Sequence, residues 1–221
     1  MTNACLEILE PTLSPDVTVS GFTAPQPAPS AIEGSLDDIM SAVAAARAII
    51  PIADQYDVFL VACYSDHALI KVLREELSQP VVGIMEASLF PARTLGGRFG
   101  ITATSQRTRY ILEDSVKAHG LDSFCARVRG CNLGVLELES KPEKEVLSIM
   151  CEMGKKLVED DADVLALGCA GMISLKSALQ IAVGEDVRVI DGVQHLAGFC
   201  RMGARTVKNG MYVSSVANGK A

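Results

Sequence analysis

The sequence lacks the features of membrane, secreted and nucleic-acid-binding proteins. Its apolar runs fall short of the roughly 18–20 residues that span a bilayer, and its N-terminus has no basic segment followed by an apolar stretch. No cluster of Lys and Arg interleaved with aromatic side chains offsets the net charge of −7. We therefore expect a cytoplasmic, globular protein that binds neither membrane nor nucleic acid.

The patterns that hold metals, cofactors or disulfides are also missing. The seven cysteines are an odd number without a C-x-x-C pair, and the three histidines form no H-x-x-x-H pattern. The glycines of LGGRFG precede a strand, whereas a dinucleotide-binding loop follows a strand and opens a helix. We therefore predict free thiols and a protein that uses no metal and no cofactor.

What the chain does contain is an alternation of two patterns. Its 221 residues are 49% hydrophobic, and short apolar runs rich in Val and Ile alternate with helical periodicity. This alternation is typical of parallel sheets covered by helices, so we predict an α/β fold. The predicted strands are 17–22, 58–62, 81–84, 99–103, 126–131, 164–167 and 187–190, and the predicted helices are 2–10, 36–50, 67–77, 106–117, 143–159 and 174–183.

One phrase of the sequence occurs twice. DVFLVAC at 57–63 returns as DVLALGC at 163–169, an offset of 106, and QPVVGIME matches VRVIDGVQ as the strand that follows. The repeat predicts two similar lobes, one formed by residues 1–92 with 193–221 and the other by residues 93–192. At this offset the strand 99–103 has no partner after residue 1. We therefore expect the first lobe to lack its opening strand and to leave a sheet position beside strands 17–22 and 58–62 uncovered.

Both copies of the phrase end in a cysteine, Cys63 or Cys169. Ligands of open α/β sheets bind beyond the carboxyl ends of the strands, so both thiols are expected to face one crevice. Each is followed by a helix start, whose free N–H groups favour a thiolate and hold a carbonyl oxygen. Two such thiols suit racemisation without a cofactor, in which one removes a proton and the other delivers one. The alternative is that each cysteine is a small buried hydrophobe.

Four segments carry a resemblance to a known family. LVACYSDHAL, QPVVGIMEAS, LGGRFGITAT and LGCAGM resemble the aspartate/glutamate racemase superfamily, and within it the hydantoin and allantoin racemase branch, from about Thr2 to His195. The resemblance implies two lobes with the active site between them, Cys63 and Cys169 as paired acid and base, and 5-substituted hydantoins as substrates. It also brings Ser30, Ile32 and Thr104 towards the substrate. Further candidate substrate-binding residues are Tyr64, Ser65, Gly168, Ala170 and Gly171. Members of this branch usually open with a strand ending in an Asn-Pro-Asn-like segment, the strand that the repeat predicts to be absent.

Other polar residues have competing interpretations. Ser65 and Asp66 lie where a helix N-cap belongs, and Ser65 is equally able to bond a ring carbonyl. Asp191 ends a strand, where it either caps the following turn or bonds a substrate N–H. His67, in the first turn of a predicted helix, is expected to face solvent or the helix dipole rather than to assist Cys63.

The leading hypothesis is a cofactor-independent racemase of hydantoins, including allantoin, that forms a homo-oligomer. Rivals within the same fold are an Asp/Glu-type amino-acid racemase and a maleate-type cis–trans isomerase. The isomerase requires cationic groups for two carboxylates, and Arg is scarce beside either cysteine motif. A further rival is a decarboxylase of this superfamily. It keeps only one of the two cysteines, so the presence of both in this chain counts against it. Outside enzymes, the alternative is a small-molecule-binding relic that has lost catalysis.

Overall fold

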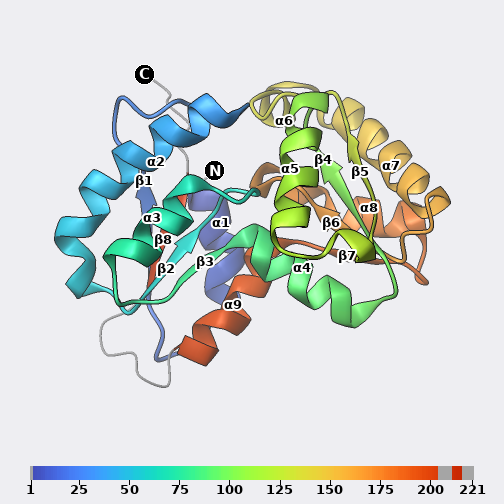
Figure 1. Ribbon diagram of the computed structural model, residues 1–221. Coiled ribbons are helices and arrows are strands. Elements are labelled where there is room, and N and C mark those ends of the chain that lie inside the picture. Colours follow the sequence, from blue (N-terminus) through green and yellow to red (C-terminus); the bar gives the residue numbers. More distant parts are fainter. Residues whose placement is uncertain (1, 204–210, 216–221) are drawn as a thin grey trace. The chain divides into compact units, whose positions relative to one another are not determined.

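The computed structural model describes residues 2–203 and 211–215 of the chain, which form two compact units. The first unit contains the described residues up to Ala87 and those from Val193 onward, and the second is Ser88–Gly192. Each unit is built on a four-stranded parallel sheet with helices packed against it (Figure 1). The predicted α/β class is therefore confirmed.

The sheet of the first unit has the strand order β1-β8-β2-β3. Its members are β1 (Val19–Thr23), β8 (Met211–Ser215), β2 (Val58–Val61) and β3 (Val81–Gly83). β8 pairs in parallel with β1 on one side and with β2 on the other (Figure 1). The expectation of an uncovered sheet position was therefore wrong, because a strand from after residue 210 occupies that position. A gap there would leave two strands with unpaired backbone groups.

The sheet of the second unit has the equivalent order β5-β4-β6-β7. Its members are β4 (Phe99–Ala103), β5 (Cys125–Gly130), β6 (Val164–Leu167) and β7 (Arg188–Ile190). β2 and β6 are buried along their whole length, which explains why VFLV and VLAL contain no polar residue. In this comparison β8 holds the place of β4, so the strand that comes first in the second unit comes last in the first.

The helices of the first unit pack on its sheet in two groups. α1 (Thr2–Leu9) contacts β1 and β8, whereas α2 (Ser35–Ile49) and α3 (Ala68–Glu76) pack against each other. α2 and α3 bury a core with the sheet that includes Ala45, Ile49, Phe59 and Leu73. A further helix, α9 (Gly192–Gly203), was not among those predicted.

The second unit repeats this arrangement. α5 (Gln106–Ala118) contacts β4 and β5, and α7 (Glu143–Glu159) packs with α8 (Lys176–Val183). α7 and α8 share a buried core with the sheet that includes Met150, Leu165, Leu167 and Leu179. The shorter elements of the second unit are α6 (Glu137–Ser140) and the 3-10 helices Asp122–Phe124 and Ala170–Leu175. The predicted helix 174–183 is thus divided between the last 3-10 turn and α8. The first unit has the 3-10 helices Glu10–Thr12 and Ile50–Gln55.

The sequence repeat is visible in the packing of the two units. Phe59 and Val61 point into the first core, and Leu165 and Leu167, 106 positions later, point into the second. An equivalent pair of side chains also ties a helix to a strand start in each unit. Arg74 donates to the carbonyl of Val81 (Nη2–O 2.7 Å), and Gln180 donates to that of Val187 (Nε2–O 2.7 Å).

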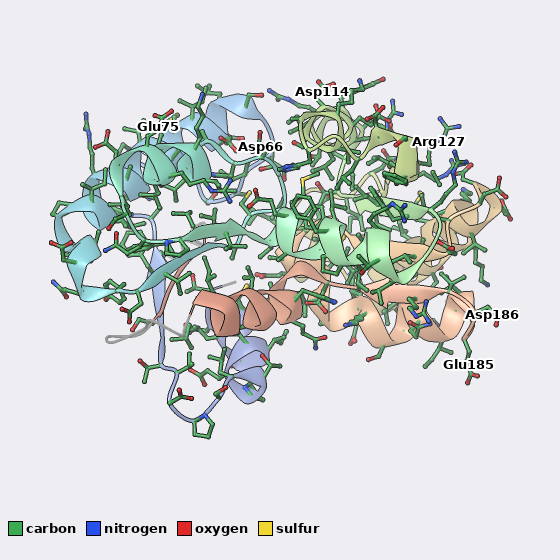
Figure 2. The ribbon with its side chains drawn as sticks, turned by 60° about the horizontal axis from the view of Figure 1, so that its bottom comes forward. Asp66, Glu75, Asp114, Arg127, Glu185 and Asp186 are labelled. Atoms are coloured by element: carbon green, nitrogen blue, oxygen red, sulfur yellow. The ribbon has the colours of Figure 1, made fainter. Side chains whose placement is uncertain are left out.

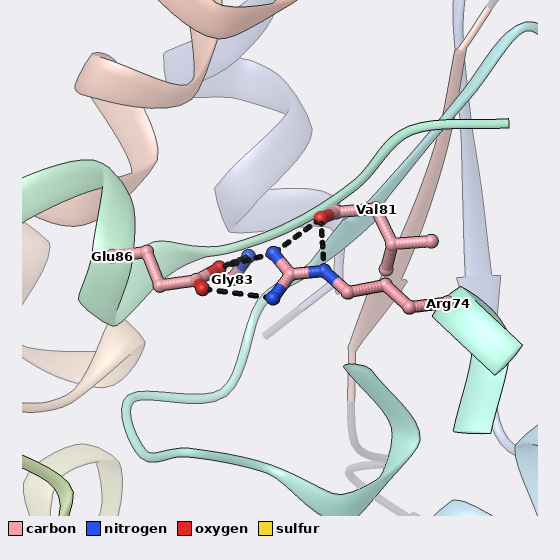
Figure 3. A network of polar contacts seen from close by, with 4 residues as sticks. All are labelled: Arg74, Val81, Gly83 and Glu86. Carbon is pink, nitrogen blue, oxygen red and sulfur yellow. Dashed lines mark hydrogen bonds and ion pairs between the residues drawn. The ribbon is translucent and has the colours of Figure 1, made fainter. Parts of the chain in front are cut away.

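The helix α4 (Ile84–Leu95) begins directly after β3, and the chain passes from the first unit to the second within it. Glu86 accepts a hydrogen bond from the N–H of Gly83 (3.1 Å), which is the carboxylate half of a capping box at the helix start, and forms an ion pair with Arg74 at 2.8 Å (Figure 3). This helix was not predicted, because Pro91 lies inside it and interrupts the helical pattern.

Candidate active site

The two predicted catalytic cysteines lie at equivalent positions of the two units. Cys63 lies two residues after the end of β2, and Cys169 lies two residues after the end of β6. Both are half-buried, and each packs against the core cluster of its own unit. Each thiol is therefore held at the carboxyl edge of a parallel sheet, where α/β proteins bind their ligands.

A tight turn follows Cys63. The N–H of Ser65 donates to the carbonyl of Cys63 (3.1 Å), and the Ser65 hydroxyl lies 3.7 Å from the Cys63 sulfur. Tyr64 and Ser65 are buried, whereas Asp66 is exposed (Figure 2). α3 begins only at Ala68. The expectation of a helix start immediately after Cys63 was therefore wrong, and the Ser65 hydroxyl lies within hydrogen-bonding distance of its sulfur.

His67, rather than Ser65 or Asp66, is the N-cap of α3. Its Nδ1 accepts from the N–H of Leu69 (3.2 Å), and its Nε2 lies 3.6 Å from an oxygen of Asp38. Because Nδ1 is an acceptor, the neutral ring carries its proton on Nε2. Burial lowers the pKa of His67, and the charge of Asp38 opposes part of that shift. His67 was predicted to face solvent or the helix dipole. It does not face solvent, since it is 2% exposed, and as the N-cap it lies at the N-terminal end of the helix dipole.

The backbone before Cys169 is tightly packed. The N–H of Gly168 donates to the carbonyl of Thr102 (2.9 Å), and a Cβ on Gly168 would lie 2.2 Å from that same oxygen. Cys169 is then the N-cap residue of the 3-10 helix Ala170–Leu175, whose first residues are Ala170 and Gly171. The predicted helix start directly after Cys169 is therefore present as a 3-10 helix, in which the N–H of Met172 donates to the carbonyl of Cys169 (3.1 Å).

Two further side chains lie at this edge of the second sheet. Thr104, directly after β4, is buried, and its hydroxyl donates to that of Thr108 (3.1 Å). Cys131, directly after β5, is also buried, and its thiol lies 3.4 Å from the sulfur of Met150. Burial raises the pKa of Cys131 to about 12, with a further contribution from nearby Cys169. Cys131 therefore stays protonated, and it is a neighbour of Cys169 that the sequence analysis did not single out.

Asp191, directly after β7, has a partner that the sequence analysis missed. Its carboxylate accepts from the ammonium of Lys176 at 2.8 Å, and its side chain is 1% exposed. Lys176 is the first residue of α8, which follows the 3-10 helix that Cys169 caps. The ion pair thus fastens the segment after Cys169 to the end of β7. The spacing of 15 residues between the two charges gave no local signal for it.

The remaining predicted binding residues lie between β1 and α2. Ser30 is exposed and Ile32 is half-buried, in the loop that leaves the carboxyl end of β1. In a parallel sheet this is the same edge as that of Cys63. Within residues 2–203 and 211–215, no three His, Cys, Asp or Glu side chains gather as metal ligands, and none of the helices there is long and apolar enough to cross a membrane.

Comparison with known proteins gives consistent matches. A family model described as Asp/Glu/Hydantoin racemase matches residues 1–200. A hydantoin racemase of Rhizobium meliloti is 38% identical over 170 residues, covering 76% of this chain and 69% of the relative. An uncharacterized protein of Schizosaccharomyces pombe is 37% identical over 218 residues, covering 96% and 92%. The crystal structure of an allantoin racemase from Pseudomonas fluorescens superposes with a TM-score of 0.84 at 31% identity, covering 92% and 85%.

Proposed function

The chain belongs to the Asp/Glu/Hydantoin racemase family and is thus an isomerase, and on this premise we propose that it racemises 5-substituted hydantoins with Cys63 and Cys169 as its two bases. The observation that carries the proposal is the equivalence of the two thiols. Each lies two residues after the same strand of two units that repeat each other in sequence, strand order and core packing. A pair related in this way is suited to act on opposite faces of one carbon.

In the proposed reaction one cysteine is a thiolate and the other a thiol. The thiolate takes the proton from the ring carbon next to a carbonyl, which leaves a planar enolate, and the thiol delivers a proton to the opposite face. One S–H bond forms and the other breaks, so the charge moves from one sulfur to the other and no redox step occurs. Each sulfur must approach the same carbon to about 3–3.5 Å, so we expect the sulfurs on the order of 7–8 Å apart in the working enzyme.

The polar groups near each cysteine suit the proposed roles of the two thiols. The hydroxyl of Ser65 lies beside Cys63, and the N–H groups that open the 3-10 helix after Cys169 are donors suited to a developing enolate oxygen. We assign Thr104, Tyr64 and the loop residues Ser30 and Ile32 to substrate contact. These assignments rest on their place at the sheet edges that carry the cysteines.

The substrate class follows from the chemistry of the carbon acid. A hydantoin C–H flanked by a carbonyl and a ring nitrogen is acidic enough for thiol bases, because less stabilisation is needed as the two pKa values approach each other. A dicarboxylate substrate would need cations at the site. Lys176, the nearest basic residue after Cys169, is already paired with Asp191. Relatives named hydantoin racemase and allantoin racemase support the same class.

Polarimetry on single enantiomers of 5-substituted hydantoins, with allantoin in the panel, tests the proposal. We expect the wild type to bring each active substrate to zero rotation. Cys63→Ser and Cys169→Ser are each expected to abolish this, whereas Cys151→Ser, a half-buried cysteine of α7, serves as the matched control and retains it.

Exchange of the ring hydrogen with solvent deuterium, followed by NMR, resolves the roles further. Each single variant is expected to exchange the hydrogen of one enantiomer only. Racemisation near the wild-type rate in either variant would refute the two-thiol mechanism. Turnover of aspartate or glutamate, but of no hydantoin, would assign the chain to the amino-acid racemases instead.

A further inference from the structure

The helix α2 has an apolar stripe on its outer face. Five large hydrophobic residues follow each other at helical spacing along it and into the next turn, and each exposes between 36% and 67% of its surface: Leu36, Ile39, Met40, Val43 and Ile50. They account for half of the large exposed hydrophobic side chains in the part of the chain that the structure describes. Isolated exposed hydrophobics are ordinary, but several large ones on one face of a helix mark an interaction surface.

This stripe is not the face that attaches α2 to its own unit. The opposite face carries small residues, Ala42, Ala45 and Ala46, together with Ile49, and these are buried against β2 and α3. The core of the first unit is therefore closed without the outer stripe. The large side chains cover nothing within that core.

The repeat provides an internal comparison. α7 is the helix of the second unit that corresponds to α2, because each follows the edge strand and precedes the buried strand that leads to the cysteine. The outer side of α7 carries the exposed residues Glu145, Ser148, Glu152, Lys155 and Glu159. One lysine there, Lys156, forms an i,i+4 ion pair with Glu152 at 2.6 Å. This position of the fold is thus compatible with an ordinary charged surface, and the apolar one is particular to α2.

We propose that the α2 stripe is the interface between two copies of this chain, packed antiparallel about a two-fold axis at Val43. The stripe is self-complementary under that symmetry, because Leu36 and Ile50 lie seven residues to either side of Val43. Leu36 of one copy therefore meets Ile50 of the other, about 10 Å from the axis at 1.5 Å per residue.

The charges of α2 agree with an antiparallel pair. Arg47, exposed, interrupts the stripe in the last turn, and Asp37, half-exposed, lies on its flank in the first turn. Under the proposed symmetry Arg47 lies opposite Ile39 of the other copy, two residues from that copy's Asp37, a separation of about 3 Å along the axis. Each guanidinium is thus given a carboxylate partner, and each acidic helix start meets a basic helix end. A parallel pair would instead bring the two arginines together.

Sedimentation velocity across a range of concentrations tests the proposal directly. The wild type is expected to sediment as a dimer or a larger even assembly, and Val43→Glu is expected to halve the mass. The matched control is Ile181→Glu, an exposed hydrophobic of α8 (83%) without apolar neighbours in a stripe, which should leave the mass unchanged. A wild type that is monomeric at 100 µM chain overturns the proposal, whichever other partner the stripe binds.

A covalent test fixes the symmetry and remains informative if Val43→Glu fails to fold. In the proposed geometry residue 43 of one chain faces residue 43 of the other, so Val43→Cys is expected to form a disulfide-linked dimer under mild oxidation. Ile181→Cys and the wild type, with its native cysteines, are the controls and should not. Leu36→Cys is expected to cross-link with Ile50→Cys when the two variants are mixed. Failure of Val43→Cys to cross-link in a sample that sediments as a dimer contradicts the antiparallel arrangement.

Discussion

Gly168 separates the end of β6 from Cys169 and has no room for a side chain. An alanine Cβ would lie 2.2 Å from the carbonyl oxygen of Thr102 and 3.0 Å from Cγ2 of Ile101. Oxygen and Cβ atoms essentially never approach within 3.0 Å, so the end of β6 would have to move away from β4 by about 1 Å. That movement strains the hydrogen bond from the Gly168 N–H to the same carbonyl, which is 2.9 Å long.

The expected cost of Gly168→Ala has two parts. Overpacking of a tight interior costs about 1–3 kcal/mol, and loss of a buried backbone hydrogen bond costs about 1–3 kcal/mol. A total of about 3 kcal/mol corresponds to a drop in Tm of about 6–12 °C for a chain of this size. Displacement of the neighbouring Cys169 by about 1 Å is expected to lower kcat by about 100-fold.

Differential scanning calorimetry and polarimetry on the same preparation measure the two effects. Gly97→Ala is the matched control in the second unit, because a Cβ there meets only an oxygen of Asp163 at an ordinary 3.4 Å. The control is expected to keep both Tm and kcat. If Gly168→Ala keeps the wild-type kcat at a temperature where it is folded, the position of Cys169 does not limit the reaction and the proposed role of this cysteine is refuted.

Three further perturbations have defined outcomes. Lys176→Met removes the ammonium group that pairs with the buried carboxylate of Asp191 and should cost about 3 kcal/mol. The double variant Lys176→Met, Asp191→Asn should recover most of that loss. Urea midpoints measure both changes, and equal midpoints for the single and double variants would contradict the ion pair. Because the pKa of His67 is lowered on folding, the unfolded chain gains a proton first as the pH falls, so stability is full above pH about 6.5 and declines below it. The variant His67→Asn keeps an N-cap, so its Tm should fall less than that of the wild type between pH 7.5 and 5. Parallel Tm profiles for the two proteins would show that His67 is not the source of the pH dependence. Val213→Pro removes a ladder hydrogen bond from the central strand β8 and should lower the free energy of unfolding by about 3 kcal/mol or more. Calorimetry measures this loss, and an unchanged Tm would mean that β8 does not hold the first sheet together.

Sequence periodicity was sufficient for the elements whose pattern is local. The helix 143–159 and the strands 99–103 and 164–167 have their predicted bounds, because a buried four-residue apolar run or a long amphipathic helix depends on neighbours in the sequence. The equivalence of Cys63 and Cys169 was also accessible, since a repeat of the same phrase requires equivalent places in equivalent sheets. The half-burial of both thiols is consistent with that prediction.

The features that the sequence did not reveal depend on distant partners. The short run Met211–Ser215 becomes a strand because β1 and β2 leave a place for it, and no signal within five residues identifies that place. His67 is buried because Asp38, 29 residues earlier, lies beside its ring, and this contact cannot be read from helix position alone. Both cases involve tertiary contacts that override a local preference.

The strand order of the first sheet has a consequence for how the chain is made. Every strand of the second unit leaves the ribosome before β8, so that unit can complete its sheet before β8 emerges. The first unit cannot, because its second strand position stays vacant until Met211–Ser215 has emerged. Throughout that interval β1 and β2 present open backbone edges, which other chains can pair with. Chains truncated between residues 192 and 211 and released from the ribosome should therefore combine a protease-resistant second unit with a protease-sensitive first unit.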